Sequence, residues 1–114
     1  GFSLGAYYAV DLAANDPERI RSVVLFYGTG DSDLSNSKAA FIGHFAEDDE
    51  YEPKSNADAM EAYLKSVGRP VNFYHYSGTQ HWFFEPDRTG EYNKAAADLA
   101  WERTLAFLKR SASK

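Results

Sequence analysis

The chain has 114 residues, of which 44% are hydrophobic and 16% aromatic, proportions that fit a single domain with a modest core. A formal net charge of −5, with no cluster of Lys and Arg, argues against a nucleic-acid partner. The absence of Cys excludes disulfides, thiolate metal sites and a cysteine nucleophile. No apolar run is long enough to cross a bilayer, so we expect no membrane partner and, by default, a cytoplasmic location.

The chain begins with a pattern that can place a serine at the apex of a sharp turn. Residues 1–5 read G-x-S-x-G, and residues 4–14 are rich in helix formers. The sequence Asn-Asp-Pro at residues 15–17 ends this helix, because the residue before a proline disfavours helical backbone. In a nucleophile elbow, Ser3 would expose its hydroxyl and Leu4 would offer its N–H to an oxyanion. Three small residues also recur by chance, so an exposed N-terminus without function is the alternative.

Three apolar runs predict buried strands, at residues 22–28, 39–45 and 71–77. A helix is expected between the second and third strands, with Ser55 as its N-cap and Gly68 beyond its end. A long amphipathic helix is expected near the C-terminus, defined by apolar residues at near-helical spacing: Tyr92, Ala95, Ala96, Leu99, Leu105 and Leu108. Strands that alternate with helices predict a parallel sheet with helices on its faces, within one domain.

Polar residues that follow the strands are the candidates for chemistry, because α/β sheets bind ligands at the carboxyl ends of their strands. His81, on the loop after the third strand, is the candidate general base for the serine. His44 and His75 lie inside predicted strands, where a structural role is favoured. The acidic run at residues 47–50 follows the second strand and can hold a histidine in one tautomer. The chain order serine, acid, histidine is that of α/β-hydrolases.

Three segments carry a family resemblance. Residues 41–53, F-I-G-H-F-A-E-D-D-E-Y-E-P, resemble the acid loop of the dienelactone hydrolase family, and residues 76–84, Y-S-G-T-Q-H-W-F-F, resemble its histidine loop. Residues 100–108 are similar to its last helix, so the resemblance runs from Gly1 to about Leu108. It implies a partial α/β-hydrolase fold of about three parallel strands with flanking helices.

The resemblance also implies roles for individual residues. By register with the family's acid loop, Asp49 is the acid, with Ser3 as the nucleophile and His81 as the base. The implied reaction is hydrolysis of a small carboxylic ester or lactone through an acyl-enzyme, with no metal and no organic cofactor. The family's namesake uses a cysteine nucleophile, whereas Ser3 resembles the serine-bearing relatives, and this departure leaves the lactone substrate open.

Several residues have a competing interpretation. Asp48 would be the acid if the register were shifted by one residue, and Asp31 or Asp33 follows the first strand, where some α/β-hydrolases place their acid. Trp82, Phe83 and Phe84 lie beside the candidate base, and Trp82 and Phe83 are the candidate substrate contacts. A core role is favoured for at least two of these three aromatic residues.

The resemblance implies a domain of about twice this length. Residues 1–114 are therefore expected to form the C-terminal portion of an α/β-hydrolase domain that starts at the elbow. Two hypotheses follow: a serine esterase of dienelactone hydrolase type, or a catalytically weak or inactive fragment. In either case the free edge of the strand at residues 22–28 is expected to lead to a homo-oligomer or to bind a missing N-terminal half.

Overall fold

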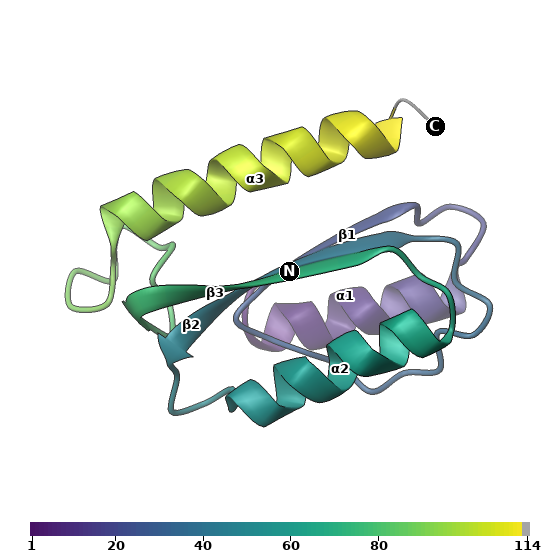
Figure 1. Ribbon diagram of the computed structural model, residues 1–114, viewed down its shortest axis with the longest axis horizontal. Coiled ribbons are helices and arrows are strands. Elements are labelled where there is room, and N and C mark those ends of the chain that lie inside the picture. The colour runs from purple at the N-terminus through teal and green to yellow at the C-terminus, as the bar shows by residue number, and fades with distance from the viewer. Residues whose placement is uncertain (113–114) are drawn as a thin grey trace.

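The computed structural model describes residues 1–112. Over these residues the elements follow the order α1 (Leu4–Asn15), β1 (Ser22–Phe26), β2 (Ala40–Asp48), α2 (Lys54–Ser66), β3 (Val71–Gln80) and α3 (Lys94–Ala112). The strands form one parallel sheet in the order β1-β2-β3, with α1 and α2 on one face and α3 on the other (Figure 1). The predicted fold class, a partial α/β-hydrolase fold with three parallel strands and flanking helices, is confirmed. No helix within residues 1–112 has the length and apolar character needed to span a membrane.

The apolar runs in the strands arise because helices cover both faces of the sheet. One cluster packs between the sheet and the helix pair α1 and α2; its buried members are Ala6, Val10, Ala13, Val23, Leu25, Leu34, Ala39, Phe41, Met60 and Leu64. The other cluster lies on the α3 side and contains Phe26, Tyr27, Ala46, Tyr76, Phe83, Ala96 and Ala100. Successive residues of β1 therefore serve opposite layers, as the period of a strand requires.

The first residues of the chain pair with the outer edge of β1. The Gly1 N-terminus donates to Val24 O at 2.8 Å, and Phe26 N–H donates to Gly1 O at 2.9 Å. Phe2 and Phe26 form a parallel bridge, and their rings stack with centroids 4.5 Å apart. The edge of β1 that was expected to be free is thus occupied, at its carboxyl end, by the residues that lead into Ser3.

The ends of α2 differ in how well the sequence predicts them. The expected N-cap at Ser55 is wrong: the helix begins at Lys54, and Pro53 caps it with extended backbone (φ −58°, ψ 145°) and no side-chain bond. Gly68 is in the left-handed conformation (φ +77°), as expected. Its N–H donates to Lys65 O, and this hydrogen bond belongs to the C-terminal helix ending that a glycine in this conformation favours.

The buried face of α3 also differs from the expected apolar stripe. Leu99, Leu105 and Leu108 remain 38–41% exposed, and Tyr92 precedes the helix. The face that meets the sheet consists mainly of small residues: Ala96, Ala97, Ala100, Thr104 and Phe107. Alanines allow α3 to approach the aromatic layer on β1 and β3 closely, and the larger leucines are left at the margin of the contact.

Candidate active site

Ser3 lies at a strained turn between the edge of β1 and the first turn of α1. Its backbone has φ 54° and ψ −119°, a conformation that residues with a Cβ rarely adopt. The Ser3 N–H donates to Phe26 O at 2.8 Å, which fixes the turn on the end of β1. Serine at a helix start commonly caps the helix through its hydroxyl, but Ser3 makes no such bond. Its Oγ is therefore available to another partner.

Two glycines leave room for this turn. A Cβ on Gly1 would lie 2.4 Å from Gly5 O, and a Cβ on Gly28 would lie 2.3 Å from Ser3 O and 2.6 Å from the Ala6 side chain. Both approaches are far shorter than a carbon atom tolerates, so these two positions require glycine. Gly5 differs, since a Cβ there meets no atom of the described residues within 4 Å. The close packing in the G-x-S-x-G pattern thus depends on its first glycine.

Ser3, His81 and Asp49 form one chain of contacts. Ser3 Oγ lies 2.8 Å from His81 Nε2, and His81 Nδ1 lies 2.6 Å from Asp49 Oδ2. The side chains of His81 and Asp49 are only 4% and 3% exposed. The three residues predicted from the sequence as nucleophile, base and acid therefore meet at the carboxyl edge of the sheet, although they come from three different connections.

The Asp49 carboxylate is held by its own loop. Oδ1 accepts two backbone hydrogen bonds, from Tyr51 N–H at 2.8 Å and from Glu52 N–H at 2.9 Å, and this leaves Oδ2 for His81. Three donors thus satisfy an almost fully buried carboxylate, which is the condition for keeping such a charge inside a protein.

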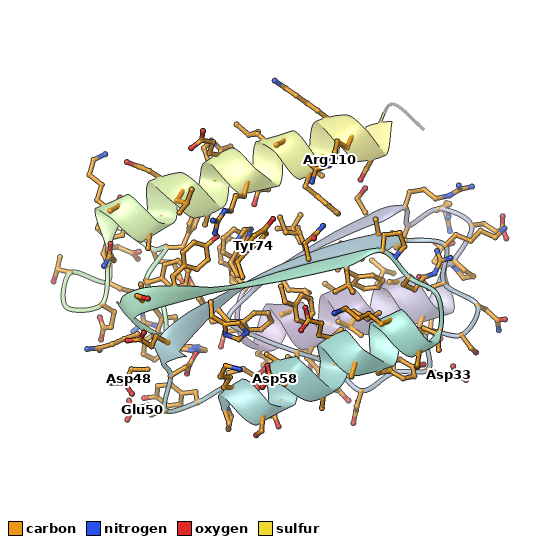
Figure 2. All side chains as sticks on the ribbon, in the orientation of Figure 1. Asp33, Asp48, Glu50, Asp58, Tyr74 and Arg110 are labelled. Atoms are coloured by element: carbon orange, nitrogen blue, oxygen red, sulfur yellow. The ribbon has the colours of Figure 1, made fainter. Side chains whose placement is uncertain are left out.

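The competing acids have other surroundings. Asp48 ends β2 as an exposed residue and pairs in register with Gln80. Asp31 and Asp33 line a cavity of about 580 Å³ between α1, the loop after β1, and α2. Figure 2 shows Asp33 at the opposite end of the molecule from Asp48. Of the four candidates, the structure places Asp49 in contact with His81.

A bulge at the end of β3 precedes the histidine. Between the pairs Ala46–Tyr76 and Asp48–Gln80, β2 advances by two residues and β3 by four. Gly78, at φ +69°, provides the backbone conformation for the extra residues. The strand therefore continues to Gln80, beyond the expected end at residue 77, and His81 follows directly. Extra residues at a strand end re-aim the side chains that come after them.

Aromatic rings surround the His81 imidazole. The rings of Tyr27 and Trp82 lie with centroids 4.8 Å from it, and that of Tyr51 lies at 5.1 Å. Tyr27 OH donates to Glu85 Oε2 at 2.5 Å, which joins the end of β1 to the histidine loop. Burial and, to a smaller extent, this hydrogen bond raise the pKa of Tyr27, so the phenol stays protonated. The ring of His81 is thus fixed by packing as well as by Asp49.

Backbone strain gathers at the same place. Within residues 1–112, the non-glycine residues with positive φ are Ser3 (54°), Tyr27 (40°) and Trp82 (70°). Ser3 hydrogen-bonds to His81, the ring of Tyr27 packs against it, and Trp82 follows it in the chain. Such strain costs about 1–3 kcal/mol per residue and persists where the surroundings enforce it, which is most common at functional sites.

The two expected substrate-binding aromatics have different environments. Trp82 lines a cavity of about 190 Å³ beside His81, together with Tyr51, Gln80, Asp48, Glu50 and Glu91, and the Arg88 guanidinium lies 4.0 Å from the Trp82 ring centroid. Phe83 is 0% exposed and packs against Tyr27 and Tyr76 in the core. Phe83 therefore has the core environment that the alternative predicts, and its substrate contact stays a prediction.

Leu4, the expected oxyanion donor, begins α1. The next two amides are used, since Gly5 N–H donates to Phe2 O and Ala6 N–H to Ser3 O. As the first residue of the helix, Leu4 carries an N–H for which the helix itself offers no acceptor. Its place beside the candidate nucleophile is the one that an oxyanion donor occupies in a nucleophile elbow.

The other two histidines have the structural settings expected of them. His44 is fully buried, with Nδ1 2.7 Å from Tyr76 OH and Nε2 2.8 Å from Thr104 Oγ1. Burial, with a smaller effect from Arg103, lowers the pKa of His44 to about 3, so its imidazole is neutral. His75 is a partly buried residue of β3 near Asp58, and this burial lowers its pKa too.

Sequence analysis missed two side chains that support this site, Tyr27 and Glu52. Both follow strands. Tyr27 belongs to no motif, Glu52 lies within the acid loop without a role assigned to it, and their partners Glu85 and Thr29 are remote in sequence. The only signal available was position, since each lies within a few residues of a strand's carboxyl end. Within residues 1–112, no group of three or more His, Cys, Asp or Glu side chains is arranged to hold a metal ion.

Comparison with known proteins agrees with this architecture. The "Putative carboxymethylenebutenolidase" of Saccharolobus solfataricus is 33% identical over 113 residues, which cover 96% of this chain and 42% of that protein. The "Protein usf" of Aquifex pyrophilus is 32% identical over 115 residues, covering 96% and 48%. An α/β-hydrolase enzyme from a Medee basin deep-sea metagenome library superimposes with a TM-score of 0.84 at 18% identity, over 100% of this chain and 53% of that one.

The chain thus spans less than half the length of the two curated relatives that it matches. The likeness to the solved structure, at 18% identity, shows a shared fold. The sequence model of the dienelactone hydrolase family matches residues 1–112, which is nearly the whole chain and includes the turn at Ser3, the acid loop and the histidine loop. The chain belongs to the dienelactone hydrolase family.

Proposed function

We propose that this chain carries the catalytic residues of a serine hydrolase that cleaves small carboxylic esters or lactones through an acyl-enzyme. The observation that carries the proposal is the buried contact chain from Ser3 Oγ through His81 to Asp49, with distances of 2.8 and 2.6 Å. Membership of the dienelactone hydrolase family supports the same reaction class.

The proposed roles follow from the hydrogen-bonding atoms. Ser3 Oγ attacks the ester carbonyl carbon while its proton passes to His81 Nε2, and the resulting imidazolium is stabilised by Asp49 at Nδ1. The carbonyl oxygen becomes an oxyanion that the Leu4 N–H would stabilise. His81 then returns the proton to the leaving alcohol oxygen as the C–O bond breaks, and a water molecule cleaves the acyl-enzyme by the same steps. This reaction requires neither a metal ion nor an organic cofactor.

Trp82 is the proposed substrate contact. It lines the cavity of about 190 Å³ next to His81, so an acyl or alcohol group bound there would touch both its ring and the general base. A cavity of this size accommodates only a small group, which agrees with a small ester or lactone.

The alternative is that this chain alone has little or no activity and serves as a self-associating or partner-binding unit. Loss of one oxyanion donor costs about 100–1000-fold in rate, so a site that relied on the Leu4 N–H alone would turn over slowly. The observation that favours association is a stripe of exposed apolar residues on α1, namely Leu4, Tyr8 and Leu12, which are 53–66% exposed. In this reading residues 1–114 are the C-terminal portion of an α/β-hydrolase domain, and a second copy or an N-terminal half covers the stripe.

The proposed function is tested by reaction with a fluorophosphonate, followed by intact-mass and peptide analysis. We expect one adduct, on Ser3, which disappears in Ser3→Ala and His81→Ala. Ser55→Ala, which removes an exposed serine from α2, should label like the wild type. An unlabelled Ser3 in a chain shown by circular dichroism to be folded would overturn the proposal, and so would an adduct that persists in Ser3→Ala.

A further inference from the structure

We propose that Glu52 is a positioning residue that holds the acid loop in the conformation in which Asp49 binds His81. The inference concerns the same site as the proposed function, but it rests on the Asp49–His81 contact and does not require turnover. Glu52 lies three residues after Asp49 and just before Pro53, which caps α2.

The Glu52 carboxylate joins two other segments to the acid loop. Oε1 accepts a hydrogen bond from Thr29 Oγ1 at 2.8 Å, in the connection after β1. Oε2 accepts one from Asn56 Nδ2 at 2.9 Å, in the first turn of α2. Both carboxylate oxygens thus accept a hydrogen bond. One bond joins Glu52 to the connection after β1, and the other joins it to α2.

The fixed residue acts on Asp49 through its backbone. The Glu52 N–H donates to Asp49 Oδ1 at 2.9 Å, and the neighbouring Tyr51 N–H donates to the same oxygen at 2.8 Å. These two bonds set the rotation of the carboxylate, so that Oδ2 lies 2.6 Å from His81 Nδ1. A loop without the anchor at Glu52 could rotate its peptide groups, and Asp49 would then lose the donors that orient it.

The connection has a direction that can be tested. The side chains of Thr29 and Asn56 bond to Glu52, and the bonds described here do not join them to Asp49 or His81. Removing the Thr29 hydroxyl should therefore weaken the Asp49–His81 contact although no atom of that contact is changed. Misplacement of a catalytic group by about 1 Å can cost up to about a hundredfold in rate.

The experiment uses the chain labelled with ¹⁵N-histidine and observes the His81 Nδ1 proton by NMR, assigned by its absence in His81→Gln. A proton shared with a buried carboxylate resonates far downfield and exchanges slowly with water. We expect the resonance in the wild type and in Thr29→Ser, which keeps the hydroxyl. Glu52→Ala and the nearly isosteric Thr29→Val should lose it or exchange it at least tenfold faster.

The rate of Ser3 labelling by the fluorophosphonate gives a second measurement, expected to fall about ten- to a hundredfold in Glu52→Ala and Thr29→Val but not in Thr29→Ser. An unchanged resonance in both variants overturns the proposal, and so does a wild-type chain that lacks the resonance. A wild type that shows the resonance but does not react with the phosphonate contradicts the proposed function and leaves the role of Glu52 intact. Thermal unfolding by circular dichroism shows that each variant is folded.

Discussion

Protonation of His44 should make the stability of this protein depend on pH in a predictable way. The imidazole is fully buried between β2 and α3, and burial with the nearby Arg103 charge lowers its pKa from 6.5 to about 3. The neutral ring can be a donor to one hydroxyl and an acceptor from the other, Tyr76 or Thr104, whereas the charged ring can only donate. Figure 2 shows Tyr74 in the same layer, pointing from the sheet toward α3, where the Arg103 guanidinium lies 4.1 Å from its ring centroid.

The sign follows from which state takes up the proton first. His44 in the unfolded chain binds a proton near pH 6.5, whereas the folded chain does so only near pH 3. Falling pH therefore favours the unfolded state, and the contribution of His44 is complete above pH 6.5 and is lost progressively down to about pH 3. Linkage over this window gives a loss of about 2 kcal/mol between pH 8 and pH 5.

The assay is urea unfolding followed by circular dichroism at pH 8, 7, 6 and 5, on the wild type and on His44→Gln. The variant should be less stable than the wild type at pH 8, because it loses part of the hydrogen bonding to Tyr76 and Thr104. Between pH 8 and pH 5, the free energy of unfolding of the variant should fall by about 2 kcal/mol less than that of the wild type. His75 and His81 are present in both proteins, so their effects cancel in the difference. Parallel pH profiles for the two proteins would refute the reasoning.

Three further predictions concern the elbow, the histidine loop and the exposed helix face. Gly28→Ala should abolish Ser3 labelling, because the new Cβ would lie 2.3 Å from Ser3 O; Gly90→Ala, where a Cβ meets no described atom within 4 Å, should label normally. Tyr27→Phe should reduce the free energy of unfolding by about 1–3 kcal/mol through loss of the bond to Glu85, whereas Tyr8→Phe on the exposed face of α1 should change it by less than about 0.5 kcal/mol in urea melts. Self-association should appear in light scattering as a mass that rises with concentration and should be suppressed by Leu12→Lys; a constant monomer mass for the wild type would exclude it.

The sequence predicts the sheet well because β1 and β2 are largely buried. The runs at residues 22–28 and 39–45 are mostly apolar, and the alternation of strands and helices over most of the chain predicts parallel strands. The end of β3 was not predictable, because residues 77–80 pair only through a bulge whose polar side chains bond across to β2, such as Thr79 to Glu47 N–H. The face of α3 was predicted at Ala96 but not at its other positions, because apolar periodicity mostly selects large side chains, while the close contact uses mainly alanines.

At the candidate site, the sequence predicts which residues meet but not what holds them. The resemblance of residues 41–53 to the family's acid loop selected Asp49, the place of His81 after a strand selected the histidine, and these two side chains contact each other. The supports are contacts between connections that lie far apart in the chain, such as Thr29 with Glu52 and Tyr27 with Glu85. A single side chain in a loop carries no mark of such a partner, so three-dimensional information is needed to find it.

The pairing of Gly1 with β1 affects how the serine turn can move. Three backbone hydrogen bonds, from the Gly1 N-terminus to Val24 O, from Phe26 N–H to Gly1 O and from Ser3 N–H to Phe26 O, attach the serine turn to the sheet. Two of these bonds involve Phe26, so an opening of the carboxyl end of β1 frees both Gly1 and Ser3. The rate at which the Phe26 amide hydrogen exchanges with deuterium would therefore measure how often the serine turn opens. Each opening that frees this amide also releases Ser3 from its place beside His81.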